Sequence, residues 1–408
     1  MKYSQVRLLL CVLLFSIAVT LPCWSFDRKT DIKARYQALR DRLSALEDSF
    51  GEIGDDELSP RLLQDQWQSI GEWISAYLDS HPIRSISQLD DAVHALDPSL
   101  AASAVRLEPQ TYAVGVQEGE RGTVFVIKHY RGGFSVAWNL SEAYKSSQEP
   151  LLAAWSAEGA QATCWSQKSE ANWGACGPLY PRLHRLPSSS AGSSRFLVDA
   201  GYAGNGGTIG GQLSIWEWDG AAARSLFVGA YVFMIDQSVG TRVDGRVIRV
   251  RTKEDWRTFF SCGSCEGRQM EWTIRVGPDG VEDLGKKAVT PELDWVDELL
   301  YRMDLGQPTY DLALPEVTAI VKQLVFDTDS ADQTEDAYLP AKDKARFSGG
   351  MISNWSVRRG QNHTTLCFSA DEIDPIIFRI KPGSSGPFFM SARPAGHECS
   401  PPKARTPY

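Results

Sequence analysis

The stretch TYAVGVQEGERGTVFVIKHYRGGFSVAWNL, Thr111–Leu140, decides the class of fold that this sequence predicts. Apolar and polar side chains alternate along it with a period of two. It is also rich in β-branched and aromatic residues, as is typical of half-buried β-strands. The Gly132–Gly133 pair separates two such runs and predicts a tight hairpin turn. The stretch therefore predicts an antiparallel meander.

A similar unit, made of a strand, a glycine turn and a short return strand, recurs along the chain. It is found in FVIKHYRGGFSVAW, LSIWEWDGAAARSLF and WTIRVGPDGVEDL. WRTFFS, residues 256–261, is interpreted as one more strand. The recurrence predicts a central antiparallel β domain over residues 105–288. Because the spacing between units is uneven, two architectures stay open, one propeller-like and the other a sandwich.

The region before this domain, residues 26–104, has the period of amphipathic helices. One apolar stripe is Ile32, Tyr36, Leu39, Leu43, Leu46 and Phe50, and a second is Leu63, Trp67, Ile70, Ile74 and Tyr77. Ser59–Pro60 suits the cap and first residue of the second helix, and a shorter helix is expected over residues 87–96. Two stripes of matched length predict an antiparallel helical hairpin. The alternative, a coiled-coil dimerisation arm, has fewer than three heptads to support it.

Residues 289–408 combine both periods. Two helices are expected to begin at Pro291 and Pro315, and four strand-like runs follow them, FSGGMISNWSVRR, TTLCFSA, PIIFRIK and PFFMSAR. Two helices followed by an antiparallel meander form an α+β unit. The whole chain is accordingly predicted to be α+β, with an N-terminal helical hairpin, a central antiparallel β domain and C-terminal helices plus a meander.

The first 25 residues have the pattern of an export signal. Lys2 and Arg7 precede an uninterrupted apolar run of 13 residues, Leu8–Thr20, and a small residue at Ser25 suits cleavage. The predicted location is periplasmic or secreted. Lipidation of Cys23 is the alternative, but Pro22 stands where a lipobox needs a small residue. A permanent membrane span needs about 18 apolar residues, so none is expected after cleavage.

Charge narrows the choice of partners. The chain has 42 basic and 51 acidic residues and a net charge of −9, which becomes −11 without the two basic residues of the signal segment. An acidic chain with no basic run argues against nucleic acid and against anionic membrane surfaces. A protein or glycan partner in the cell envelope is the expectation.

Six cysteines remain after cleavage, and an even number in an exported chain predicts disulfides. Proximity favours three local pairs: Cys164 with Cys176, Cys262 with Cys265, and Cys367 with Cys399. The C-x-x-C pair at residues 262–265 also allows a redox couple or half of a zinc site. Strand patterns flank it and no helix follows, so a disulfide at the tip of a hairpin is the preferred interpretation.

Ligand-binding candidates gather around one predicted hairpin. Gly204 and Gly206 belong to the glycine-rich run GYAGNGGTIGGQ, where backbone can approach a ligand closely. Asp199 precedes that run, and Trp216, Trp218 and Asp219 follow it. The two tryptophans share one strand face, so they belong either to the core or to a sugar-stacking platform. No motif predicts a metal site or a cofactor.

The predicted function is a non-catalytic, envelope-associated binding or interaction module, and no catalytic residue is assigned. The alternative is a hydrolase acting on glycan or cell-wall material through carboxylates at strand ends. Asp199, Glu217 and Asp219 are its candidates, because a carboxylate pair needs no sequence motif. A thiol oxidoreductase using Cys262 is a third hypothesis.

Overall fold

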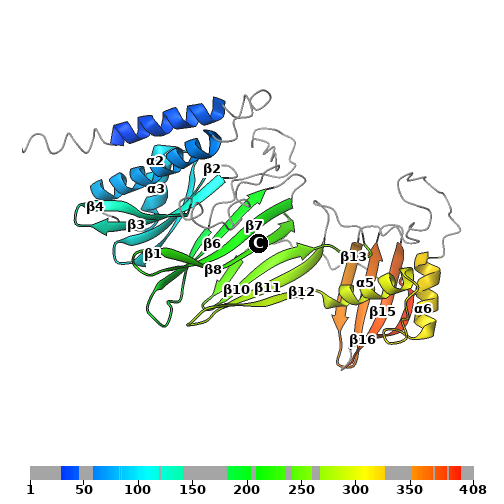
Figure 1. Cartoon of the computed structure of the whole chain (residues 1–408). Helices are drawn as coiled ribbons and strands as arrows, with labels where there is room; N and C mark the ends of the chain where they lie inside the picture. The colour runs from blue at the N-terminus through cyan, green and yellow to red at the C-terminus, as the bar shows by residue number, and fades with distance from the viewer. Residues whose placement is uncertain are drawn as a thin grey trace, which may run out of the picture.

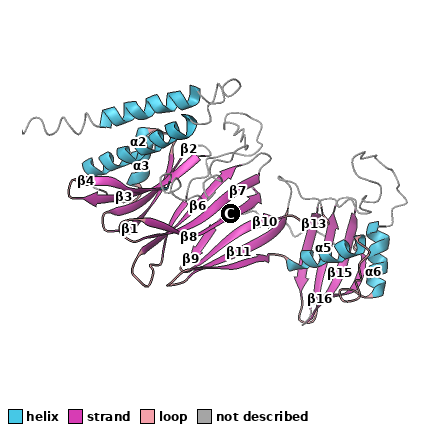
Figure 2. Ribbon diagram, viewed as in Figure 1, coloured by secondary structure: helices cyan, strands magenta, loops and turns pink. Residues whose placement is uncertain are grey.

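The computed structural model shows an α+β protein made mostly of β-strands (Figures 1 and 2). It describes residues 29–45, 58–81, 83, 85–118, 121–140, 182–203, 208–234, 241–259, 267–326, 352–370, 373–383 and 386–396. Across these ranges the strands form four sheets of four strands each, and every pairing within a sheet is antiparallel.

The N-terminal elements are three helices. They cover residues 29–45, α2 (Leu58–Ser80) and α3 (Gln88–Leu96). The apolar stripe of the first helix is buried against α2, since Ile32 and Tyr36 share a core cluster with Ile70. Arg35 also pairs with Glu72, and Leu39 packs with Leu62. Among the described helices, none has the length and apolar character needed to cross a membrane.

The first three sheets follow one another along the chain. The first sheet is β1 (Ala101–Glu108), β2 (Thr111–Glu118), β3 (Arg121–Tyr130) and β4 (Gly133–Asn139). The second sheet is β5 (Arg182–Leu186), β6 (Ser194–Ala203), β7 (Thr208–Trp218) and β8 (Ala223–Met234). The third sheet is β9 (Thr241–Asp244), β10 (Val247–Glu254), β11 (Arg268–Val276) and β12 (Val281–Ala288). Each sheet keeps its strands in chain order.

Three buried clusters lie between these layers. The helices pack on one face of the first sheet, where Ile70 contacts a cluster that includes Phe125. The other face of that sheet packs on the second sheet, with Val126 and Trp218 in one cluster. The opposite face of the second sheet packs on the third, joining Leu213 to Ile274. These three clusters place the layers in the order helices, first sheet, second sheet, third sheet.

The glycine turns lie where the sequence predicts them. Gly133 and Gly220 have φ values of +120° and +101°, in the region that side chains with a Cβ rarely adopt. Gly133 also lies under Asp79 of α2, whose Oδ1 would be 2.6 Å from an added Cβ. The same carboxylate accepts a hydrogen bond of 2.6 Å from the Phe134 backbone N–H. The β3–β4 turn therefore anchors the helix to the first sheet.

The C-terminal elements form a separate core. They are α5 (Pro291–Asp304), α6 (Pro315–Val321), the π-helical turn η3 (Lys322–Phe326) and the fourth sheet, which comprises β13 (Ile352–Arg359), β14 (Thr364–Ala370), β15 (Ile373–Gly383) and β16 (Gly386–Pro394). Both helices begin at the predicted prolines. Their apolar faces, including Leu299 and Val317, cover one face of the fourth sheet (Figure 1).

Three details differ from the sequence-based expectation. The described part of the expected strand over 256–261 is a bend with a single bridge at Phe259, because the Asp297 carboxylate accepts the Arg257 and Thr258 backbone N–H groups. The strands β1, β5 and β9 have no counterpart among the predicted strands. β1 also spans the predicted boundary at residues 104/105, and the domain limits themselves stay predictions.

Candidate functional site

Asp199 lies on β6, on the side of the second sheet that meets the third, since it shares a strand face with Leu197. Its side chain is 5 % exposed. The hydroxyl of Tyr231, on β8, donates a hydrogen bond of 2.5 Å to Asp199 Oδ1. Burial raises the pKa of Asp199, and the hydrogen bond from Tyr231 offsets only part of that effect. Burial, together with the nearby carboxylate, also raises the pKa of Tyr231.

His184 brings a third titratable group to this cluster. It lies on β5, two residues from Arg182, which is paired in register with Asp199. Burial lowers the pKa of His184, Asp199 opposes the shift, and Arg182 adds to it. The Nε2 atom of His184 is buried and, within the described residues, has no hydrogen-bond partner. Asp199, Tyr231 and His184 thus form a polar cluster on the side of the second sheet that meets the third, and Asp199 and Tyr231 are buried in it.

Glu217, the second candidate carboxylate, is held between two arginines. Arg195 Nε donates to Glu217 Oε1 over 3.0 Å, and Arg224 Nε donates to Oε2 over 2.8 Å. Burial raises the pKa of Glu217, but the hydrogen bonds from Arg224 and Arg195 outweigh it and hold the pKa below its ordinary value. Arg195 itself is 2 % exposed. Glu217 is therefore the ionised partner of a buried ion pair and is unsuited to proton donation.

Asp219, the third candidate, organises the β7–β8 turn. Its Oδ1 accepts hydrogen bonds from the backbone N–H groups of Ala221 and Ala222, at 2.8 and 2.9 Å. These amides lower the pKa of Asp219. Lys128 donates to the Gly220 carbonyl in the same turn over 2.8 Å. The carboxylate is exposed, but its lone pairs serve the turn in the manner of an Asx-turn.

Trp216 and Trp218 belong to the core between the first and second sheets. Trp216 is 8 % exposed and Trp218 is fully buried. The Trp216 ring lies 5.1 Å from Trp138, and its Nε1 donates to Ser214. Trp218 Nε1 is buried without a hydrogen-bond partner among the described residues. With no exposed ring face, the pair cannot act as a surface platform for stacking a sugar.

Most of the remaining predicted residues lie outside the part of the chain that the structure describes. Gly204 and Gly206 lie outside the described residues, as do the cysteines at 164, 176, 262, 265 and 399. Cys367 on β14 is described and is disulfide-bonded. Its pairing with Cys399 stays a prediction.

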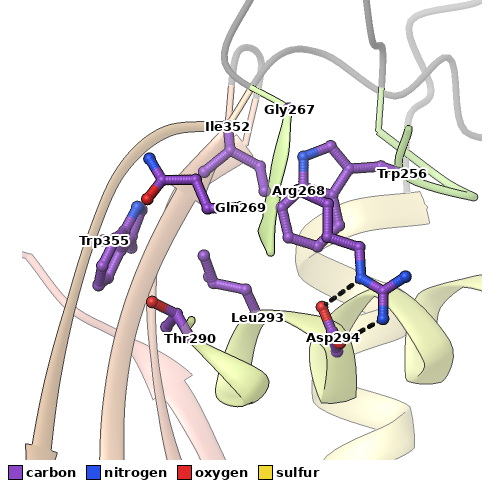
Figure 3. A pocket seen from close by; sticks show the side chains of 9 residues that line it. All are labelled: Trp256, Gly267, Arg268, Gln269, Thr290, Leu293, Asp294, Ile352 and Trp355. Atoms are coloured by element: carbon purple, nitrogen blue, oxygen red, sulfur yellow. Dashed lines mark hydrogen bonds and ion pairs between the residues drawn. The ribbon is translucent and has the colours of Figure 1, made fainter. Parts of the chain in front are cut away.

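A pocket that the sequence did not indicate lies between the third sheet and the C-terminal core (Figure 3). Trp256, Arg268, Asp294 and Trp355 line it, with Arg268 and Asp294 joined by two hydrogen bonds of 2.9 and 2.7 Å. Its volume is about 20 Å³, which leaves room for little more than one water molecule. These residues come from four segments far apart in the chain, so no local pattern could have revealed the pocket.

A larger groove lies between α2 and β4. Its volume is about 300 Å³, at the lower end for small-ligand pockets. Of its lining residues, Glu72 is already paired with Arg35, and Phe125 and Val136 pack in the apolar cluster under the helices. The one charged side chain of the lining is therefore already neutralised.

Metal ligands do not gather in the described ranges, where no group of three or more His, Cys, Asp or Glu side chains could hold an ion. In comparisons with known proteins, the chain matches no family model and no curated protein sequence.

Proposed function

We propose that this chain is an exported, non-catalytic binding module that acts in the cell envelope, in the periplasm or outside the cell. The proposal rests on one observation: each of the three candidate carboxylates is bound to other groups of the scaffold. Asp199 is hydrogen-bonded between two sheets, Glu217 is clamped by Arg195, and Asp219 binds turn amides. A glycosidase needs two carboxylates facing one open cleft. Here all three support the scaffold.

The scaffold proposed for this module is a stack of blade-like sheets capped by the N-terminal helical hairpin. The chain-order sheets and the clusters between successive layers support a propeller-like arrangement over a two-layer sandwich, because the second sheet buries both of its faces. In this proposal the helices cover the first sheet as a cap, and the third sheet ends the stack.

The function is tested with the purified mature chain and isolated peptidoglycan. Binding is measured by co-sedimentation, and hydrolysis by the release of soluble reducing sugar from the same samples. We expect the chain to sediment with the glycan while no reducing sugar appears above the buffer control. Sugar release at a rate proportional to the protein concentration would overturn the non-catalytic assignment.

The hydrolase stays as the second candidate because of one observation, the raised pKa of Asp199. A carboxyl group whose pKa is raised by burial is better suited than an ordinary one to donate a proton to a glycosidic oxygen. This alternative requires that Asp199→Asn abolish any sugar release while Asp219→Asn, on an exposed turn, preserves it. Equal activity of the two variants would exclude Asp199 as the acid.

A further inference from the structure

The groove between α2 and β4 follows the open edge of the first sheet. β4 is the last strand of that sheet, and within the described residues it pairs with β3 alone. Six consecutive residues of the strand, 134–139, line the groove together with Phe125 and three residues of α2, which lies alongside β4 (Figure 1). Because side chains alternate between the two faces of a strand, consecutive residues line one groove where it runs along the strand's edge. The backbone of β4 is therefore part of the groove.

The register of the β3–β4 hairpin shows which backbone groups of β4 point outward. The two-residue turn is closed by a hydrogen-bonded pair, so the next pair, His129 with Phe134, is not bonded to each other. Two contacts agree with this phase. The His129 N–H donates to the Gln110 carbonyl, on the side of β3 away from β4, and the Phe134 N–H donates to Asp79 of α2. Val136, two residues after Phe134, therefore also points its N–H and C=O away from β3.

These outward groups of Val136 are unused. In the described part of the chain, neither its N–H nor its C=O takes part in a hydrogen bond with backbone or side chain. Val136 lines the groove and is half-buried, so a ligand in the groove can reach both groups. A strand edge with an unused donor and acceptor is a template for pairing with another strand.

The side chains around Val136 determine what kind of residue fits opposite it. A residue that is paired directly with Val136 on an added antiparallel strand places its side chain on the same face as the Val136 side chain. That face belongs to the apolar cluster under α2, where Phe125 and Phe134 also pack. With a volume of about 300 Å³, the groove has room for an apolar side chain there.

Charge contributes little to this groove. Glu72 is the one charged side chain of the lining, and both of its carboxylate oxygens are engaged. Oε1 accepts a hydrogen bond from Gln68, and Oε2 pairs with Arg35. A ligand is therefore held by backbone hydrogen bonds and apolar contact, and an uncharged segment fits best.

We propose that the groove takes an extended, uncharged peptide segment of a partner protein, which adds to the edge of β4 as a fifth strand of the first sheet. One peptide residue bonds the N–H and C=O of Val136, and its apolar side chain enters the groove beneath α2. Asp79 already accepts the Phe134 N–H, so it limits the added strand at the end near the β3–β4 turn. This assignment rests on the proposed binding function and names its partner class and its surface.

The experiment measures binding of a fluorescein-labelled hexapeptide of alternating valine and threonine to the full mature chain by fluorescence anisotropy. The reference is the same peptide N-methylated at its valines, which keeps every side chain and loses the N–H groups that would face β4. We expect the plain peptide to bind about tenfold more tightly, the scale of one or two lost hydrogen bonds. Its affinity should be nearly the same at about 50 and 500 mM salt, because no unpaired charge lines the groove. The bound peptide should also slow hydrogen exchange of the Val136 amide.

Two variants test the site itself. Gln68→Trp fills the groove and should abolish binding of the peptide. Its matched control is Gln37→Trp on the first helix, outside the groove, since each glutamine donates to an acidic residue four positions on, Glu72 or Asp41. The control should bind as the native chain does. Val136→Pro removes the outward N–H and leaves the pairing with β3, so it should weaken binding about threefold to tenfold.

Several results would overturn the assignment. Equal affinities for the plain and the N-methylated peptide would mean that the strand edge is not used. Equal losses for Gln68→Trp and Gln37→Trp would mean that the peptide binds elsewhere. Absence of binding up to about 1 mM peptide, the range of the weakest specific complexes, would refute the groove as a peptide site. If the chain then still sedimented with peptidoglycan, and Gln68→Trp did so equally, the proposed binding function would stand without this groove.

Discussion

Arg195→Met tests how the second and third sheets are held together. Arg195 donates to Glu217 within its own sheet and reaches across to the β11–β12 turn. There Nη1 donates to the Gly277 carbonyl over 2.6 Å and Nη2 to the Pro278 carbonyl over 3.2 Å. Methionine fills a similar length without any donor. The substitution leaves a buried carboxylate with one arginine and leaves two carbonyls without their side-chain donor.

The loss of stability expected for Arg195→Met follows from the burial of Arg195 and Glu217. Breaking a buried ion pair typically destabilises a protein by about 3–5 kcal/mol, and because Arg224 still pairs with Glu217 we expect the lower end of that range. That is a large share of the total stability of a protein, about 5–15 kcal/mol. With a urea dependence of about 3 kcal/mol per M, the midpoint of unfolding should fall by about 1 M or more.

The assay is urea unfolding followed by tryptophan fluorescence, with Arg224→Met as the matched control. Arg224 contacts the same carboxylate, but its side chain is 74 % exposed. An exposed ion pair contributes roughly 0–1 kcal/mol, so the control should shift the midpoint by no more than about 0.3 M. Equal shifts of the midpoint in the two variants would refute the argument that burial makes the contacts of Arg195 strong.

Three further substitutions address single contacts. Asp199→Asn removes a carboxyl whose folded-state pKa is raised, so the contribution of Asp199 to stability is greatest below its ordinary pKa near 4 and is lost as pH rises through the raised value. The stability of the native chain relative to the variant should thus fall as pH rises above about 4 and through the raised pKa, and a constant difference would contradict the assignment. Gly229→Ala places a Cβ 2.0 Å from the Trp272 ring and should cost about 1–3 kcal/mol in thermal unfolding, while Gly280→Ala, which meets nothing within 4 Å, should be near neutral. Trp218→Phe removes a buried N–H that has no partner among the described residues, whereas Trp216→Phe also loses the hydrogen bond to Ser214. Trp218→Phe should therefore lower the free energy of unfolding less than Trp216→Phe does. The opposite order would show that ring volume dominates.

Local structure was largely predictable because its causes are local. The alternation in residues 111–140 predicts strands that the structure places at β2, β3 and β4, with the turn at Gly133. The stripe beginning at Ile32 and Tyr36 predicts a helix face that is buried. In each case the spacing of apolar residues and the turn residues suffice.

The candidate site was harder to predict because it depends on which sheet faces are covered. Alternation places Trp216 and Trp218 on one face, but only the stacking of the first sheet on the second determines that this face is buried. The contact between Asp199 and Tyr231 likewise requires the register of three strands.

The strand order of the four sheets has a consequence for how the chain folds. In the described part of the chain, every strand is paired only with the strands next to it in the sequence, so each sheet forms through short-range contacts. Low contact order reduces the entropy lost in forming the first native pairings and is associated with fast folding. The sheets can therefore form one after another from the N-terminus while the chain is still being synthesised. Stacking of one finished sheet on the next would then be the slower step, and the step at which Arg195 becomes buried.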